Sequence, residues 1–145
     1  MIFFDLRGMK KLCKPLIIGS KYHSTIDYDL YYRLEIKPYL EAGKFHLWLD
    51  SDNNAKALVT YAFLSDDILA GVTSNYKSSL RLSDFDTGQN LYINDLFAKS
   101  NGKKIIRELR ETIFPYHVGH FVRRHPDTTI RLVSKIYGKK SERYQ

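Results

Sequence analysis

The chain has 145 residues, of which 43% are hydrophobic and 27% are charged. These values favour a single folded domain and argue against a disordered chain or two full domains. No run of about 18 apolar residues is present, which excludes a transmembrane segment. Cys13 is the single cysteine, so an internal disulfide is excluded and a reducing compartment, most simply the cytoplasm, is expected. We expect one domain over residues 1–145, with an N-terminal lead-in at 1–18 and a basic tail at 139–145.

Positive charge is concentrated near the C-terminus. Residues 99–145 hold 12 of the 23 Lys and Arg residues but only 4 of the 16 Asp and Glu residues. Such a skew attracts an acidic partner, which could be nucleic acid, an anionic membrane surface or an acidic protein. A solvated basic face without a special partner explains the same pattern equally well.

The first half of the chain predicts helix, hairpin and helix. Residues 27–43 have helical periodicity through Leu30, Tyr31 and Leu34, with a break or kink expected at Pro38. Residues 45–64 alternate as a β-hairpin around a polar turn at 50–54. Ser65 is placed to cap a helix that runs to about residue 74.

The second half predicts strand, helix, helix and strand. The expected elements are a central strand at 90–98, a helix at 101–113 ended by Pro115, a short helix at 116–123 and a last strand at 128–137. An antiparallel hairpin followed by a strand–helix–strand unit predicts a mixed α/β (α+β) fold, with a central sheet flanked by helices.

Common catalytic and cofactor motifs are missing. The sequence contains no Walker-type phosphate loop, dinucleotide-binding glycine motif, nucleophile elbow or zinc-binding HExxH. His117 and His120 have a spacing that can share a helix face, but no cysteine or carboxylate adjoins them, so a metal site has little support. No strand motif combines basic and aromatic residues for nucleic-acid binding.

Two ionisable residues have unusual positions. His23 precedes the first predicted helix, and Asp95 lies inside an otherwise neutral strand. A carboxylate in a sheet is costly to bury without a partner, and a His–Asp pair fixes the imidazole tautomer and raises its basicity. A surface histidine and a strand-end carboxylate that caps a turn are the simpler interpretations of the two positions.

These residues belong to a longer set of short motifs in a fixed order. Ser20 to His23 form a Ser-x-x-His, Pro38 lies in a helix, and Ser65 closes a hairpin that ends in an aromatic residue and Leu-Ser. Further short motifs follow Asp95: Arg110, Phe114-Pro115, Val122-Arg123, Pro126, Val133-Ser134 and Gly138. In their order and spacing, which needs no gaps from Asp95 onward, these motifs make the sequence resemble the RTX toxin-activating lysine acyltransferases, which mature haemolysin-type protoxins in the cytoplasm.

The resemblance implies a fold and a reaction. The fold is a variant of the N-acetyltransferase (GNAT) architecture in one domain. The reaction transfers a fatty acyl group from acyl carrier protein, the co-substrate, to the ε-amine of internal lysines on an RTX protoxin, with no bound cofactor and no metal. The catalytic pair carried over by position is His23 and Asp95; a slip of one residue would place Asn94 there, but the gapless match favours Asp95. The family tends to form homodimers.

The resemblance also gives the basic C-terminal third a role. Acyl carrier protein is acidic, so docking is expected at Lys103, Arg107, Arg123 and Arg124, with Arg123 as the best candidate because it falls on a basic position of the family. The alternative is that these side chains only solvate a helix. Lys104 and Arg110 are further candidates for the same role.

Two other functions remain open from the sequence. One is an N-acyltransferase that uses acyl-coenzyme A, although no pyrophosphate-binding glycine loop is present. The other is a non-catalytic binding module that uses its basic face. The acyltransferase interpretation requires His23 and Asp95 to line one cleft, and the binding module does not.

Overall fold

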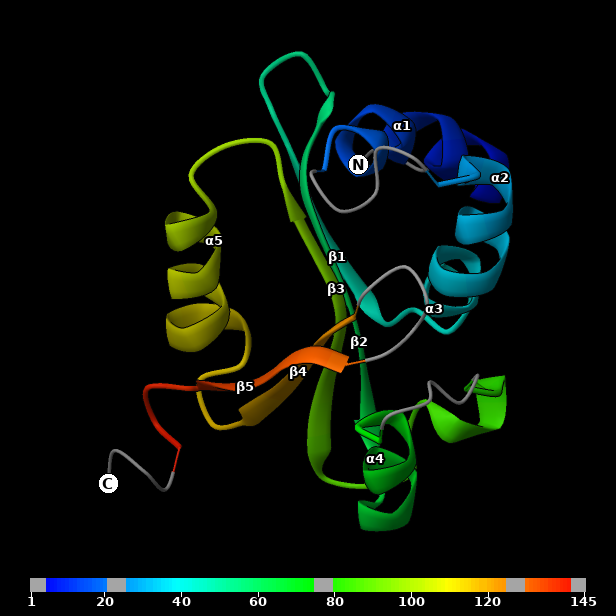
Figure 1. Cartoon of the computed structure of the whole chain (residues 1–145). Coiled ribbons are helices and arrows are strands. Elements are labelled where there is room, and N and C mark those ends of the chain that lie inside the picture. Colours follow the sequence, from blue (N-terminus) through cyan, green and yellow to red (C-terminus); the bar gives the residue numbers. More distant parts are fainter. Residues whose placement is uncertain (1–4, 21–25, 75–79, 125–129, 142–145) are drawn as a thin grey trace.

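A computed structural model of the chain describes residues 5–20, 26–74, 80–124 and 130–141. At its centre is a five-stranded open sheet with the order β1-β2-β3-β4-β5 (Figure 1). The strands are β1 (Phe45–Leu49), β2 (Ala55–Leu64), β3 (Asn90–Ala98), β4 (Val118–Arg124) and β5 (Ile130–Tyr137). Neighbouring strands are antiparallel except β3 and β4, which are parallel. This mixed sheet with flanking helices confirms the predicted α/β class.

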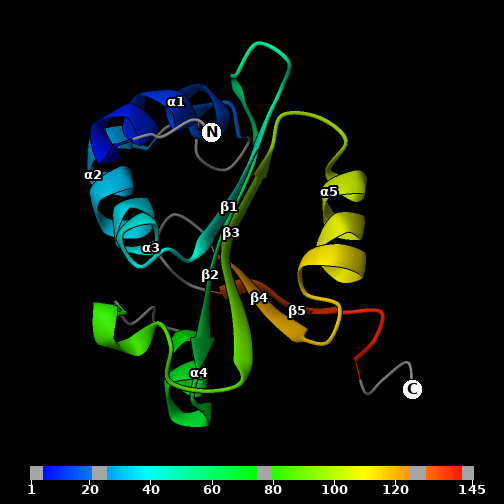
Figure 2. The same ribbon diagram turned by 180° about the vertical axis from the view of Figure 1, so that it is seen from behind.

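Helices cover both faces of the sheet (Figures 1 and 2). The N-terminal helices lie against one face and α5 (Gly102–Glu108) against the other, while α4 (Asp66–Val72) lies near one end of β2. Strand β3 contributes to both layers. Its Ile93 packs with Leu109 beyond α5, and its Phe97 packs with Tyr28 on the N-terminal side. Side chains of β3 therefore divide between two cores.

Helix α1 (Leu6–Ile18) is part of the main core, in the segment that the sequence analysis treats as a lead-in. Asp5 caps it by accepting a hydrogen bond from the Gly8 N–H at 2.6 Å. Its buried residues follow a helical spacing and are Met9, Cys13, Leu16 and Ile17. Burial of this stripe against the sheet stabilises the helix.

The predicted helix at 27–43 forms as three consecutive pieces. They are α2 (Tyr28–Tyr31), a π-helical segment η1 (Tyr32–Ile36) and α3 (Lys37–Glu41). Pro38 lies in the first turn of α3 and has no N–H to donate. Just before it, the Lys37 N–H bonds to the carbonyl five residues back, that of Tyr32, instead of the usual four. The helix therefore continues through the predicted break with a changed hydrogen-bonding pattern.

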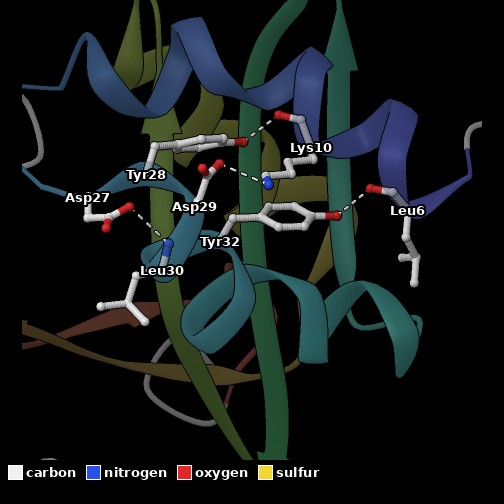
Figure 3. A network of polar contacts seen from close by, with 7 residues as sticks. All are labelled: Leu6, Lys10, Asp27, Tyr28, Asp29, Leu30 and Tyr32. Carbon is white, nitrogen blue, oxygen red and sulfur yellow. Dashed lines mark hydrogen bonds and ion pairs between the residues drawn. The ribbon is translucent and has the colours of Figure 1, made fainter.

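Tyrosine hydroxyls join α1 to α2 and η1 (Figure 3). Tyr28 donates to the Lys10 carbonyl at 2.5 Å, and Tyr32 donates to the Leu6 carbonyl at 2.6 Å. An ion pair between Lys10 and Asp29 at 2.9 Å adds a third link. These contacts fix the orientation of α2 against α1.

The buried face of this helix differs from the predicted one. Leu30 and Leu34 are 43% and 59% exposed, whereas Tyr28, Tyr32 and Ile36 are buried. The i, i+4 pair of leucines has the same period as the tyrosine face, so periodicity alone does not say which stripe faces the core. Tyrosines take the inner face because α1 supplies carbonyl acceptors for their hydroxyls.

Most of the other predicted elements are confirmed. The hairpin forms from β1 and β2, and the Ser65 side chain caps α4 by accepting from the Ile68 N–H at 3.4 Å. Strand β3 has the predicted bounds, and the helix after it continues as a second π-helical segment, η3 (Leu109–Ile113).

The predicted short helix at 116–123 is wrong. Residues 118–124 form β4, which pairs with β3 and with β5. Val118, Phe121 and Val122 are strong strand formers, and two neighbouring strands satisfy their backbone groups, so sheet pairing overrides the helical pattern. His120 lies on this strand and His117 just precedes it, so the expected shared helix face for the two histidines does not exist.

Candidate active site

Asp95 lies at an irregularity in the β2–β3 ladder. Thr60 pairs with Asp95 and Tyr61 pairs with Ile93, so Asn94 is an extra residue in β3. Such a bulge changes which face a side chain points to. Ile93 and Leu96 pack on the α5 side, whereas Asp95 contacts the N-terminal helices. The bulge thus directs Asn94 and Asp95 to the same face of the sheet, which strict alternation would forbid.

Two described side chains reach the same oxygen of the Asp95 carboxylate. The Tyr31 hydroxyl at the end of α2 donates to Oδ2, and Asn94 Nδ2 lies 3.4 Å from the same atom. Asn94 is itself held, since its Nδ2 lies 3.2 Å from the Glu35 carbonyl oxygen and 3.3 Å from Thr60 Oγ1. Thr60 is fully buried and Asn94 nearly so, so the carboxylate is supported by a fixed polar network.

The Tyr31 hydroxyl is a hydrogen-bond donor over the physiological pH range. Burial is the main cause that raises the pKa of Tyr31 well above its ordinary value, and the charge of Asp95 and their hydrogen bond add to it. A phenol that stays protonated donates to the carboxylate and favours its ionised form.

The π-helical segment η1 supplies one of these contacts. It places the Glu35 carbonyl within reach of the Asn94 amide, across from the bulge in β3. π-Helical segments and β-bulges both occur often at functional sites. Here the two irregularities face each other at Asp95.

His23 lies outside the described residues, between Ser20 and Ile26. Its pairing with Asp95 therefore stays a prediction. Ser20, which begins the Ser-x-x-His motif, lines a cavity beside β3.

This cavity lies between α1 and the end of β3 and has a volume of about 480 Å³. Its apolar lining comes from both elements and includes Leu12, Leu16, Leu96, Phe97 and Ala98. Two cations, Lys99 and Arg123, also line it. An apolar hollow with a few polar groups is typical of a small-molecule or cofactor site, and Phe97, two residues after Asp95 in β3, lines this one.

The predicted docking residues separate in the fold. Arg123 lines the cavity, and its guanidinium lies 4.8 Å from the centre of the Phe121 ring. Lys103 and Arg107 are exposed on α5, which covers the opposite face of the sheet from the Asp95 carboxylate. Arg124 ends β4, and the structure does not describe its side chain.

Cys13 has none of the surroundings of a nucleophile. It is fully buried in the core, and burial raises the pKa of its thiol to about 11. A reactive cysteine needs a lowered pKa and access to substrate. A covalent acyl-enzyme on Cys13 is therefore disfavoured.

The sequence points to Asp95 but not to the residues that form hydrogen bonds around it. In the sequence analysis Tyr31 is part of a helical periodicity, and Asn94 is only a possible slip of register. Thr60 has no assigned role there. A polar pair, Asn94-Asp95, in an apolar strand is the one signal that could have suggested a bulge.

Other features of the described residues are negative. Within 5–20, 26–74, 80–124 and 130–141, no helix has both the length and the apolar character needed to cross a membrane. Among the same residues, no group of three or more His, Cys, Asp or Glu side chains is arranged to hold a metal ion.

The chain is a small α/β domain with a carboxylate held by hydrogen bonds and an apolar cavity along the same strand, and comparison with known families gives its class as an acyltransferase. Residues 22–137 match the RTX toxin acyltransferase family. Because the match covers most of the 145 residues, the chain belongs to this family. No curated protein sequence matches the chain.

Proposed function

We propose that the protein transfers a fatty acyl group from acyl carrier protein to the ε-amine of internal lysines on an RTX protoxin in the cytoplasm. Membership of an RTX toxin acyltransferase family supports the reaction class. The observation that carries the proposal is Asp95, an acidic side chain held by Tyr31 and Asn94 where the resemblance expects a catalytic aspartate.

His23 is the proposed general base. A lysine amine has a pKa of about 10.4, so it must lose a proton before it attacks. His23 accepts that proton, and the free amine then attacks the thioester carbonyl. The nitrogen of the tetrahedral intermediate loses a second proton as the C–S bond breaks, the departing carrier thiolate takes that proton, and an amide remains on the lysine. Asp95 stabilises the imidazolium or receives the incoming ammonium group.

The cavity beside β3 suits the proposed donor. Its apolar wall fits a fatty acyl chain, and Lys99 and Arg123 fit the phosphate of the carrier's prosthetic arm. Phe97 on this wall lies two residues after Asp95 in β3. An acyl chain in this cavity would place its thioester near the carboxylate.

The test is acyl transfer to a protoxin fragment with internal lysines, co-expressed with the protein and read by intact mass. Wild type is expected to add a mass equal to a fatty acyl chain. His23→Ala and Asp95→Asn are each expected to lower the rate at least about 100-fold. His46→Ala is the matched control, because His46 is exposed on β1 and contacts Trp48 rather than the site.

Other outcomes favour other functions. Acylation with acyl-coenzyme A but not with acyl carrier protein would identify an ordinary N-acyltransferase. No acylation with any donor, together with binding to an acidic partner, would favour a non-catalytic module. A mass gain that survives His23→Ala would keep the activity and contradict the proposed base.

A further inference from the structure

Three tyrosines within five residues use their hydroxyls differently. Tyr28 and Tyr32 donate to backbone carbonyls of α1 and join two helices (Figure 3). Tyr31, between them, is turned toward the sheet and donates to the Asp95 side chain. The first two hydrogen bonds have a structural role, whereas the third ends on the carboxylate of the proposed catalytic pair.

Both described donors to Asp95 reach the same oxygen. The Tyr31 hydroxyl and Asn94 Nδ2 converge on Oδ2, and Asn94 is fixed by Thr60 Oγ1 and the Glu35 carbonyl. Two donors that hold Oδ2 restrict rotation of the carboxylate group and so fix its plane.

We infer that Tyr31 is a positioning residue, whose hydroxyl acts with the Asn94 amide to hold Oδ2 of Asp95 and so fixes the orientation of the carboxylate in the proposed catalytic pair. The inference rests on the proposed function, which makes Asp95 part of the catalytic pair. Tyr31 does not touch substrate; it acts through Asp95.

The hydrogen bond also affects the charge of Asp95. Among the described residues, Asp95, Glu35 and Tyr39 interact electrostatically with Tyr31, and Tyr92 of β3 interacts with Tyr39. The phenol of Tyr39 has its pKa raised well above the ordinary value, chiefly by burial, and stays neutral. Donors at Oδ2 favour the ionised carboxylate, so their loss raises the pKa of Asp95.

The test compares Tyr31→Phe with Tyr28→Phe and Tyr32→Phe in the full chain. Each variant removes one hydroxyl that donates a hydrogen bond, and each keeps the ring. The pKa of Asp95 is measured by carboxyl carbon NMR, with Asp95→Asn to assign its signal. Tyr31→Phe is expected to raise that pKa by about one pH unit. It is also expected to lower kcat about tenfold with KM for the carrier unchanged, because orientation rather than binding is lost.

The two control variants are expected to leave the pKa of Asp95 and kcat unchanged, while lowering thermal stability about as much as Tyr31→Phe does. The inference is overturned if Tyr31→Phe leaves the pKa of Asp95 in place, if it raises that pKa without lowering kcat, or if Tyr28→Phe has the same effects. If wild type transfers no acyl group, the proposed function fails, whereas the NMR titration still decides whether Tyr31 holds the carboxylate.

Discussion

Cys13 is the chain's one thiol, and its surroundings decide whether it can carry an acyl group. It lies in α1 with no exposed surface, and burial raises its pKa to about 11. At pH 8 about one native thiol in a thousand is then ionised, whereas an unfolded chain would ionise far more. A thiol in this state does not attack a thioester.

Cys13→Ala is therefore expected to retain acyl transfer at close to the wild-type rate per folded molecule. Removing the buried sulfur leaves a small cavity, so the free energy of unfolding should fall by about 1 kcal/mol. Intact mass after treatment with iodoacetamide at pH 8 gives the second measurement: native protein should stay unmodified and urea-unfolded protein should gain one adduct. Loss of acylation with normal folding would show that the thiol takes part.

A single sequence can reveal a side chain that conflicts with its surroundings. Asp95 stood out because a carboxylate in a neutral strand needs a partner. Tyr31 did not stand out, because a tyrosine is also common on the apolar face of a helix. Its role depends on a contact with a residue 64 positions away, and one sequence carries no direct sign of such a contact. The face of the sheet to which Asp95 points also depends on the bulge at Asn94. The usual alternation of side chains along a strand does not predict this bulge.

Local signals predicted most elements. Ser65 capped its helix and the turn at 50–54 closed its hairpin, because caps and turns are determined by nearby residues. Helix α1 was not predicted, and β4 was predicted as a helix. Its residues 118–124 depend on pairing with β3 and β5, so tertiary pairing decides between helix and strand there.

The end of β5 is packed closely against the turn after η3. A Cβ atom at Gly138 would lie 2.3 Å from the Phe114 carbonyl oxygen and 2.4 Å from that of Pro115. Gly138→Ala is expected to lower the free energy of unfolding by about 2 kcal/mol, because backbone on both sides must move. Thermal or urea unfolding measures this change.

Gly71→Ala is the matched control for that substitution. Gly71 lies in α4, and nothing lies within 4 Å of its added Cβ. Alanine is a better helix former, so this variant should gain about 0.5–1 kcal/mol of stability. Equal stability changes in the two variants would contradict the close packing at Gly138.

The cavity between α1 and β3 predicts a limit on acyl chain length. Ala98 lines it near the end of β3, and a phenyl ring there takes the volume of about six carbon atoms. Ala98→Phe is therefore expected to shift the transferred chains toward shorter ones by about two to four methylene groups, as read by intact mass with mixed donors.

Ala70→Phe is the control for the cavity, because Ala70 is exposed on α4 and does not line it. It should leave the distribution of chain lengths unchanged. An unchanged distribution in Ala98→Phe as well would place the acyl chain elsewhere, without contradicting acyl transfer itself.

At the scale of the whole molecule, the basic C-terminal third is divided between two faces. Lys103 and Arg107 lie exposed on α5, on the opposite side of the sheet from the Asp95 carboxylate. Arg123 and Lys99 line the cavity between α1 and β3. Net positive charge favours the approach of an acidic partner, but only cations near the cavity can hold such a partner at the proposed site.

Arg123→Glu is expected to raise KM for acyl carrier protein at least about tenfold, because it replaces an attractive charge at the cavity by a repulsive one. Lys103→Glu makes the same charge change on α5 and is expected to alter KM less than about twofold, since rim charges far from the docked partner contribute little. Steady-state acylation at two salt concentrations measures both. Raised salt should weaken wild-type binding more than that of Arg123→Glu. Equal losses in the two variants would mean that the carrier responds to net charge alone, and a larger loss in Lys103→Glu would move its docking surface to α5.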